Sequence, residues 1–77
     1  MSVHWNPLHP LMFVSADSIG NVKVWDLFKD FDNGKWNCNI GKCCFDAKWD
    51  FDGRNLGLAN ENGDIIIKRF KKEFFEY

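Results

Sequence analysis

GNVKVWDL, at residues 20–27, has a counterpart in GDIIIKRF at residues 63–70. In both segments a turn glycine leads into residues of high β-propensity. Each segment follows an apolar run that begins near a tryptophan, Trp5 in the first copy and Trp49 in the second. The two tryptophans lie 44 residues apart and the two glycines lie 43 apart. The chain therefore contains one structural unit twice.

A repeat of this period indicates a β-propeller, in which one four-stranded blade takes about 40–45 residues. Propellers close with about four to eight blades, and about three or more stacked repeats are needed for stability. The 77 residues hold fewer than two full units. We therefore expect an all-β fragment of a propeller, with about two four-stranded antiparallel blades. The missing blades would lie in a longer parent protein, beyond a truncated gene model, or in a partner chain.

The two units are expected at residues 1–42, which include an outer strand, and at residues 43–77, which form a partial and more divergent repeat. Alternating apolar residues and turn residues predict the strands. These are expected near residues 2–6, 11–16, 22–25, 36–40, 45–49, 56–58 and 65–67. Asn33-Gly34 suits a type I′ turn. The isoleucines at 65–67 predict a strand covered on both faces, and the tail at 71–77 favours a fourth strand over a helical turn.

The composition favours a folded cytosolic chain. Apolar residues make up 45% of it and aromatic residues 17%, which is too hydrophobic for disorder at a net charge of −1. No apolar run approaches the roughly 18 residues of a membrane span, and residues 1–7 lack the pattern of a signal peptide. Near-neutral charge provides no long-range attraction to nucleic acids or acidic membranes. We expect neither as a partner, and we interpret the basic cluster at 68–72 as a solvated strand edge.

The cysteines and histidines form no recognisable chemical site. Cys38, Cys43 and Cys44 have the spacing C-x4-C-C, and His4 and His9 lie far upstream, which does not match zinc sites. An odd number of cysteines fits reduced thiols. The histidines have no acid or cysteine neighbour in sequence that could make a catalytic pair. We expect no enzyme activity, cofactor or metal; a small metal-binding or nucleic-acid-binding protein stays an alternative.

Residues 15–27, SADSIGNVKVWDL, resemble the middle of a WD40 repeat, in which a serine, a turn aspartate beside glycine and a terminal Trp-Asp recur. The resemblance implies hydrogen bonds that hold the strands of a blade together. Ile19 stands where the family has the aspartate, and Lys68 stands at the tryptophan place of the second unit. The residues with implied structural roles are Ser15, Asp17, Gly20, Trp25, Asp26, Asn62 and Gly63. The candidate core aromatics are Trp5, Phe13 and Trp49.

WNPLHPLMF, at residues 5–13, resembles the W-x-P-x-H-P-x-x-F segment of dynein intermediate chains, and the Trp-Asp-Leu at 25–27 resembles the end of their next hairpin. The resemblance covers about residues 3–70. It implies a non-catalytic scaffold that docks on a dynein heavy chain with other dynein subunits, in the cytoplasm on the cytoskeleton or in the axoneme. The alternative is a WD-repeat adaptor of another complex such as a ubiquitin ligase. That family usually has an arginine where this chain has Phe28.

Overall fold

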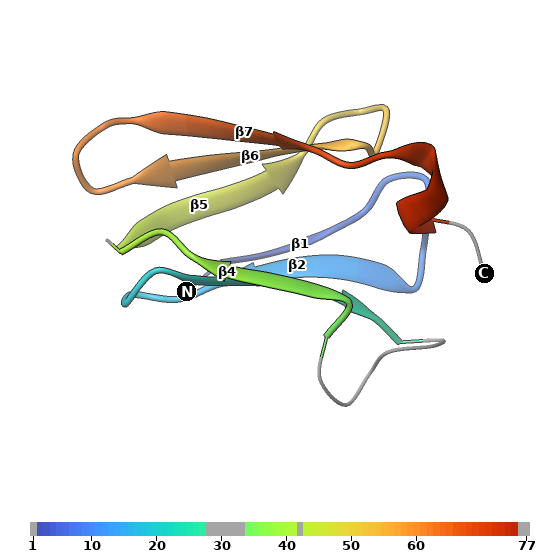
Figure 1. The fold of residues 1–77 in the computed structure, drawn as a ribbon, viewed down its shortest axis with the longest axis horizontal. Coiled ribbons are helices and arrows are strands. Elements are labelled where there is room, and N and C mark those ends of the chain that lie inside the picture. The colour runs from blue at the N-terminus through green and yellow to red at the C-terminus, as the bar shows by residue number, and fades with distance from the viewer. Residues whose placement is uncertain (1, 28–33, 42, 76–77) are drawn as a thin grey trace.

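The computed structural model describes residues 2–27, 34–41 and 43–75, and these form two antiparallel sheets that pack face to face (Figure 1). The order of the first sheet is β1-β2-β3-β4 and that of the second is β5-β6-β7. The strands are β1 (Ser2–Trp5), β2 (Met12–Ala16), β3 (Asn21–Asp26), β4 (Trp36–Asn39), β5 (Cys44–Trp49), β6 (Asn55–Asn60) and β7 (Ile65–Arg69). The predicted all-β fold is confirmed. The turn predicted at Asn33-Gly34 falls partly outside the described residues.

The tail forms one 3-10 turn, η1 (Lys72–Phe75), and not the strand favoured for residues 71–77. Three aromatic rings explain this difference. The ring centroid of Phe70 lies 4.3 Å from that of Phe74 and 6.3 Å from that of Phe75. Adjacent side chains of a strand point to opposite faces, so a strand could not bring both rings to Phe70. The second sheet therefore has three strands among the described residues. The described residues also include no helix that is long and apolar enough to cross a membrane.

The core lies between the two sheets, where β5 packs against β1 and β2. Side chains alternate along β2, β3 and β6, so every second residue of these strands faces the other sheet. The buried apolar residues are Met12, Val14, Ala16, Val22, Val24, Cys44, Ala47, Trp49, Leu56, Leu58 and Phe70. Of the three cysteines, which are all free thiols, Cys44 belongs to this core and Cys43 is half-buried.

Polar residues on one face of β1 and its extension connect the two sheets. Residues 2, 4 and 6 share that face because side chains alternate along an extended chain. The three bonds are Ser2 Oγ to Asp46 Oδ1 (3.1 Å), the backbone N–H of Trp49 to His4 Nδ1 (2.9 Å) and Asn6 Nδ2 to the carbonyl of Gly53 (2.8 Å). The face of β1 that meets the second sheet is therefore the polar one.

Only one of the three candidate core aromatics, Trp49 of β5, lies between the two sheets. Trp49 is buried between the sheets and Phe13 is half-buried, whereas Trp5 is 51% exposed. The core position expected for Trp5 is wrong, because the polar face of β1 packs against β5 and Trp5 points away from it. Its ring instead lies against Phe13, with 5.0 Å between centroids.

β7 is exposed along its whole length, although its isoleucines predict a strand covered on both faces. Ile65 is 74% exposed and Ile67 is 65% exposed. Within the described residues no strand pairs with the outer edge of β7, and no second sheet covers the face that carries these two side chains. The prediction is therefore wrong for this part of the chain, where the apolar sequence of β7 is not matched by burial.

Candidate functional site

The open face of the first sheet carries a row of three aromatic residues, Trp5, Phe13 and Trp25, which we call the aromatic row. Trp5 pairs with Phe13 across β1 and β2, and Phe13 pairs with Trp25 across β2 and β3. The ring centroids lie 5.0 Å and 6.1 Å apart. Directly opposed aromatic pairs are stabilising on a sheet surface. The row therefore presents a continuous apolar strip across three strands.

Two polar side chains hold Trp25 in this row. Its indole Nε1–H donates to Ser15 Oγ at 3.0 Å, and Lys23 Nζ lies 5.3 Å from its ring centroid. Ser15 and Lys23 are themselves directly opposite each other in the β2–β3 register. The indole is therefore fixed both by its hydrogen bond and by a cation on its ring.

Ser15→Ala is expected to lower the free energy of unfolding by about 1 kcal/mol, because the indole N–H of Trp25 loses its acceptor. Ser15→Thr is the matched control, since it keeps the hydroxyl and suits a strand. Urea denaturation of the two variants and the parent measures the effect. Equal stability of the alanine and threonine variants would contradict a stabilising role for this bond.

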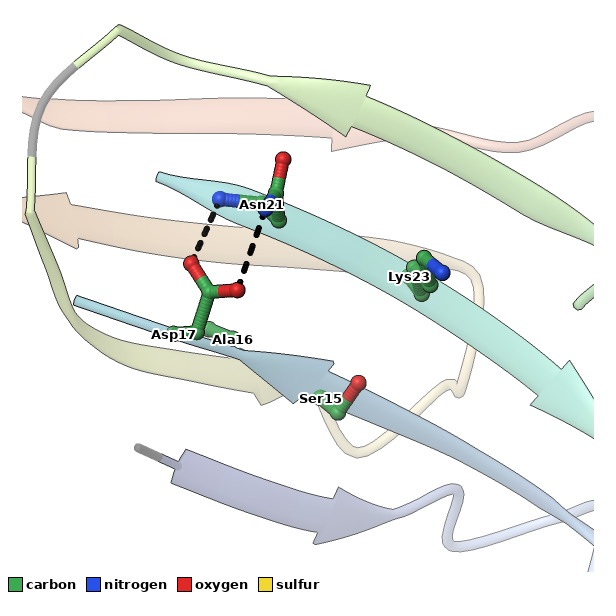
Figure 2. Close-up of a pocket in the computed structure, with 5 residues that line it drawn as sticks. All are labelled: Ser15, Ala16, Asp17, Asn21 and Lys23. Carbon is green, nitrogen blue, oxygen red and sulfur yellow. Dashed lines mark hydrogen bonds between the residues drawn. The ribbon is translucent and has the colours of Figure 1, made fainter. Parts of the chain in front are cut away.

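A shallow pocket of about 170 Å³ lies over the start of the β2–β3 hairpin, lined by Ser15, Ala16, Asp17, Asn21 and Lys23 (Figure 2). Asp17 Oδ1 accepts from the backbone N–H of Asn21 at 2.9 Å, and Asp17 Oδ2 accepts from Asn21 Nδ2 at 3.1 Å, as Figure 2 shows. The backbone hydrogen bond from Asn21 is the main cause of the lowered pKa of Asp17. The carboxylate is thus engaged in closing the hairpin.

The second hairpin uses the same arrangement with the two residue types exchanged. Asn60 Oδ1 accepts from the backbone N–H groups of Asn62 and Asp64 at 3.0 Å each, and Asn60 Nδ2 donates to Asp64 Oδ2 at 3.4 Å. Asn60 lies 43 residues after Asp17, and Asp64 lies 43 after Asn21. An aspartate followed by an asparagine in one hairpin thus corresponds to an asparagine followed by an aspartate in the other.

Asn62 stands at the aspartate place of the WD40 pattern and was expected to have a structural role, but the structure places the side-chain bonds of this hairpin on Asn60. Asn62 is exposed, and among the described residues its side chain forms no hydrogen bond. The expectation for that side chain is wrong because the resemblance places the acceptor directly before the glycine, whereas this chain places it three residues before. Gly20 and Gly63 hold the expected turn positions, with φ of 90° and 84° that favour glycine.

Asp26 and Asn6 are two polar residues that are buried in the fold. Asp26 ends β3 and is fully buried. Asn6 is also buried; its Oδ1 accepts from the backbone N–H groups of Leu8 at 2.9 Å and His9 at 3.1 Å, while its amide donates to Gly53. Sequence reasoning missed Asn6, although its place two residues after His4 continues the polar face of β1.

No protein-family model matches the chain. Among solved structures, the crystal structure of the β-propeller domain of Cps50 (Swd1) from Myceliophteria thermophila is similar, with a TM-score of 0.74 over 92% of this chain at 14% identity. The chain covers 22% of the length of that propeller. At this identity the likeness shows the fold. The chain thus has the fold of a β-propeller fragment, with two sheets that correspond to neighbouring blades.

Proposed function

We propose that the protein is a non-catalytic scaffold for protein–protein interactions. The observation that carries this proposal is that one histidine and two carboxylates of the chain are engaged in structural bonds. His4 Nδ1 accepts the backbone N–H of Trp49, and the Asp17 carboxylate is held within its hairpin. Asp50 is held in the same way by Asn55, at 2.6 Å from its side-chain amide. Among the described residues the sheets also carry exposed apolar side chains, such as Trp5, Ile65 and Ile67, and exposed apolar patches suit binding to other proteins.

The finer proposal is a dynein intermediate chain-like subunit that docks on a dynein heavy chain. It is supported by the resemblance of residues 5–13 and 25–27 to that family. In this chain residues 5–13 run from the end of β1 into β2, and within them Asn6 caps the turn and also bonds to Gly53. A subunit of this kind would work on the cytoskeleton, in the cytoplasm or the axoneme, together with other dynein subunits.

Affinity purification of the tagged full-length protein tests the finer proposal. We expect a dynein heavy chain to co-purify, and we expect it to be absent when the bait is a tagged WD40 propeller from another complex. Quantitative mass spectrometry of both eluates gives the comparison. Recovery of ubiquitin-ligase subunits in place of a heavy chain would overturn the motor assignment and leave the scaffold proposal standing.

A further inference from the structure

The turn between β6 and β7 contains two asparagines in different environments. Asn60 is 6% exposed, and its side chain accepts the backbone N–H groups of Asn62 and Asp64 and donates to the carboxylate of Asp64. Asn62 is exposed, and its side chain forms no hydrogen bond within the described part of the chain. One asparagine of the turn is thus held in place, and the side chain of the other can rotate.

Gly63 leaves open space beside the peptide bond that follows Asn62. It is exposed, its φ is 84°, and outside the adjoining residues no atom lies within 4 Å of the place where a Cβ would be. Its N–H donates to the carbonyl of Asn60 at 3.1 Å, so this bond has to open before the nitrogen can react. The exposed tip of a hairpin opens locally at a small cost in free energy.

The turn lies where the propeller architecture does not cover it. Neighbouring blades stack on the faces of a sheet, and a further strand pairs along its edge. Residues 61–64 instead lie between the ends of two paired strands, and all four are exposed. The exposure of Asn62 therefore has a different origin from that of Ile65 and Ile67, which lie on a blade face.

We propose that Asn62 is a site of spontaneous deamidation and isomerisation, at which the chain modifies itself without an enzyme. The backbone nitrogen of Gly63 loses its proton and attacks Cγ of Asn62. A C–N bond forms, the side-chain nitrogen leaves as ammonia, and a five-membered succinimide ring results. Water then opens the ring at one of its two carbonyl carbons. The products are an aspartate and an isoaspartate, in which the backbone continues through the side-chain carbonyl carbon.

The isoaspartate product would change the turn in two ways. It adds one carbon to the backbone between Asn60 and Asp64, whose hydrogen bonds span the modified link. These are the N–H of Asn60 to the carbonyl of Asp64 at 3.1 Å and the N–H of Asp64 to Oδ1 of Asn60 at 3.0 Å. The product also adds a carboxylate beside Glu61 and Asp64, and like charges repel. We therefore expect modification to loosen the β6–β7 hairpin as the protein ages.

Incubation of the intact protein at neutral and at mildly alkaline pH, followed by trypsin digestion and liquid chromatography with mass spectrometry, tests the proposal. Trypsin releases residues 55–68 as one peptide, and synthetic forms with asparagine, aspartate or isoaspartate at position 62 are the standards. We expect Asn62 to convert at least about tenfold faster than Asn60, whose side-chain bonds must also be broken before it reacts. The rate should rise with pH, because the attacking nitrogen must lose its proton.

Three variants separate the steps of the reaction. Asn62→Gln keeps the amide but would have to form a six-membered ring, so conversion should fall at least about tenfold. Gly63→Ala keeps Asn62 and places a methyl group beside the attacking nitrogen, which should also slow conversion. Asn62→Asp has the new carboxylate in an unmodified backbone. If the added carbon loosens the hairpin, aged protein rich in isoaspartate should unfold at a lower urea concentration than Asn62→Asp.

Two results would overturn the proposal. One is an Asn62 that stays unmodified in the folded protein while the synthetic peptide of residues 55–68 is converted, because the hairpin then protects it. The other is equal conversion in the parent and in Gly63→Ala with aspartate as the sole product, because water then hydrolyses the side chain directly. Asn33-Gly34 is released in a different tryptic peptide, so its conversion is measured separately. No partner protein enters these measurements, so they are independent of the scaffold proposal.

Discussion

Gly53→Ala is expected to lower the free energy of unfolding by about 3 kcal/mol, whereas the matched change Gly63→Ala should cost only about 1 kcal/mol. Both glycines have left-handed backbones, with φ of 71° and 84°. That conformation costs an L-residue roughly 1–2 kcal/mol. The difference between the two sites lies in what surrounds the added methyl group.

A Cβ at position 53 would lie 2.6 Å from Oδ1 of Asn6, and one at position 63 would have no neighbour within 4 Å. Asn6 is buried and donates to the carbonyl of Gly53 across the two sheets. Its displacement would break that bond and disturb the turn bonds to Leu8 and His9. A buried polar group left without its partner costs about 1–3 kcal/mol.

Urea denaturation of the intact protein and both variants measures this prediction. Repeating the pair in an Asn6→Ala background provides the control, because the extra cost at position 53 should largely disappear when the asparagine is absent. Neighbouring sites of this kind are coupled, so the double-mutant cycle should give a clear interaction energy. Equal costs for Gly53→Ala and Gly63→Ala would contradict the proposed connection between the sheets.

Local sequence signals were sufficient to predict the strands and hairpins. Gly20 and Gly63 each indicate a hairpin turn at their own position. Val22 and Val24 indicate the buried face of the strand that contains them. The structure accordingly has strands at each predicted place before the tail. Turn glycines and alternating burial carry this information because they are set by backbone geometry.

Which face of a strand becomes buried depended on residues far away in sequence. Trp5 looks like a core residue from its size, but His4 and Asn6 on the other face of β1 find partners 45 and 47 residues later, in Trp49 and Gly53. Pairwise hydrogen bonds of this kind leave no periodic signal in one sequence. The polar face of β1 therefore could not be assigned to the core from composition or alternation.

Two other predictions were wrong, those for Asn62 and for the tail at residues 71–77. In both, the sequence near the residue contained a signal for the observed structure. Asn62 was expected to have a structural role because it stands at the aspartate place directly before Gly63, yet the repeat spacing from Asp17 leads to Asn60, which makes the bonds. The tail was expected as a strand although Phe70 and Phe74 have the spacing of one helical turn, and their rings do pack together. In both cases the internal comparison of the two units is more informative than the family pattern.

A chain limited to residues 1–77 is expected to self-associate or to be unstable, and not to behave as a monomer that melts cooperatively. Both outer faces of its sheets carry large exposed apolar side chains, Trp5 on the first sheet and Ile65 and Ile67 on the second. No described strand pairs with the outer edge of β7, so that edge also has backbone groups without a strand partner in the part of the chain that the structure describes. Exposed apolar patches and open strand edges are common causes of association.

Light scattering after size exclusion, together with thermal unfolding followed by circular dichroism, tests this expectation. The weight-average mass should exceed the 9.0 kDa of a monomer at least about twofold. Ile67→Pro tests the contribution of the strand edge to association, since it removes an outward N–H. Ile65→Thr with Ile67→Thr tests the contribution of the apolar face, since both N–H groups remain. If only the threonine pair lowers the mass, the chain associates through blade faces, as neighbouring blades do in a propeller. A cooperatively melting monomer would instead mean that the core between two sheets suffices for folding and that the exposed faces are tolerated in water.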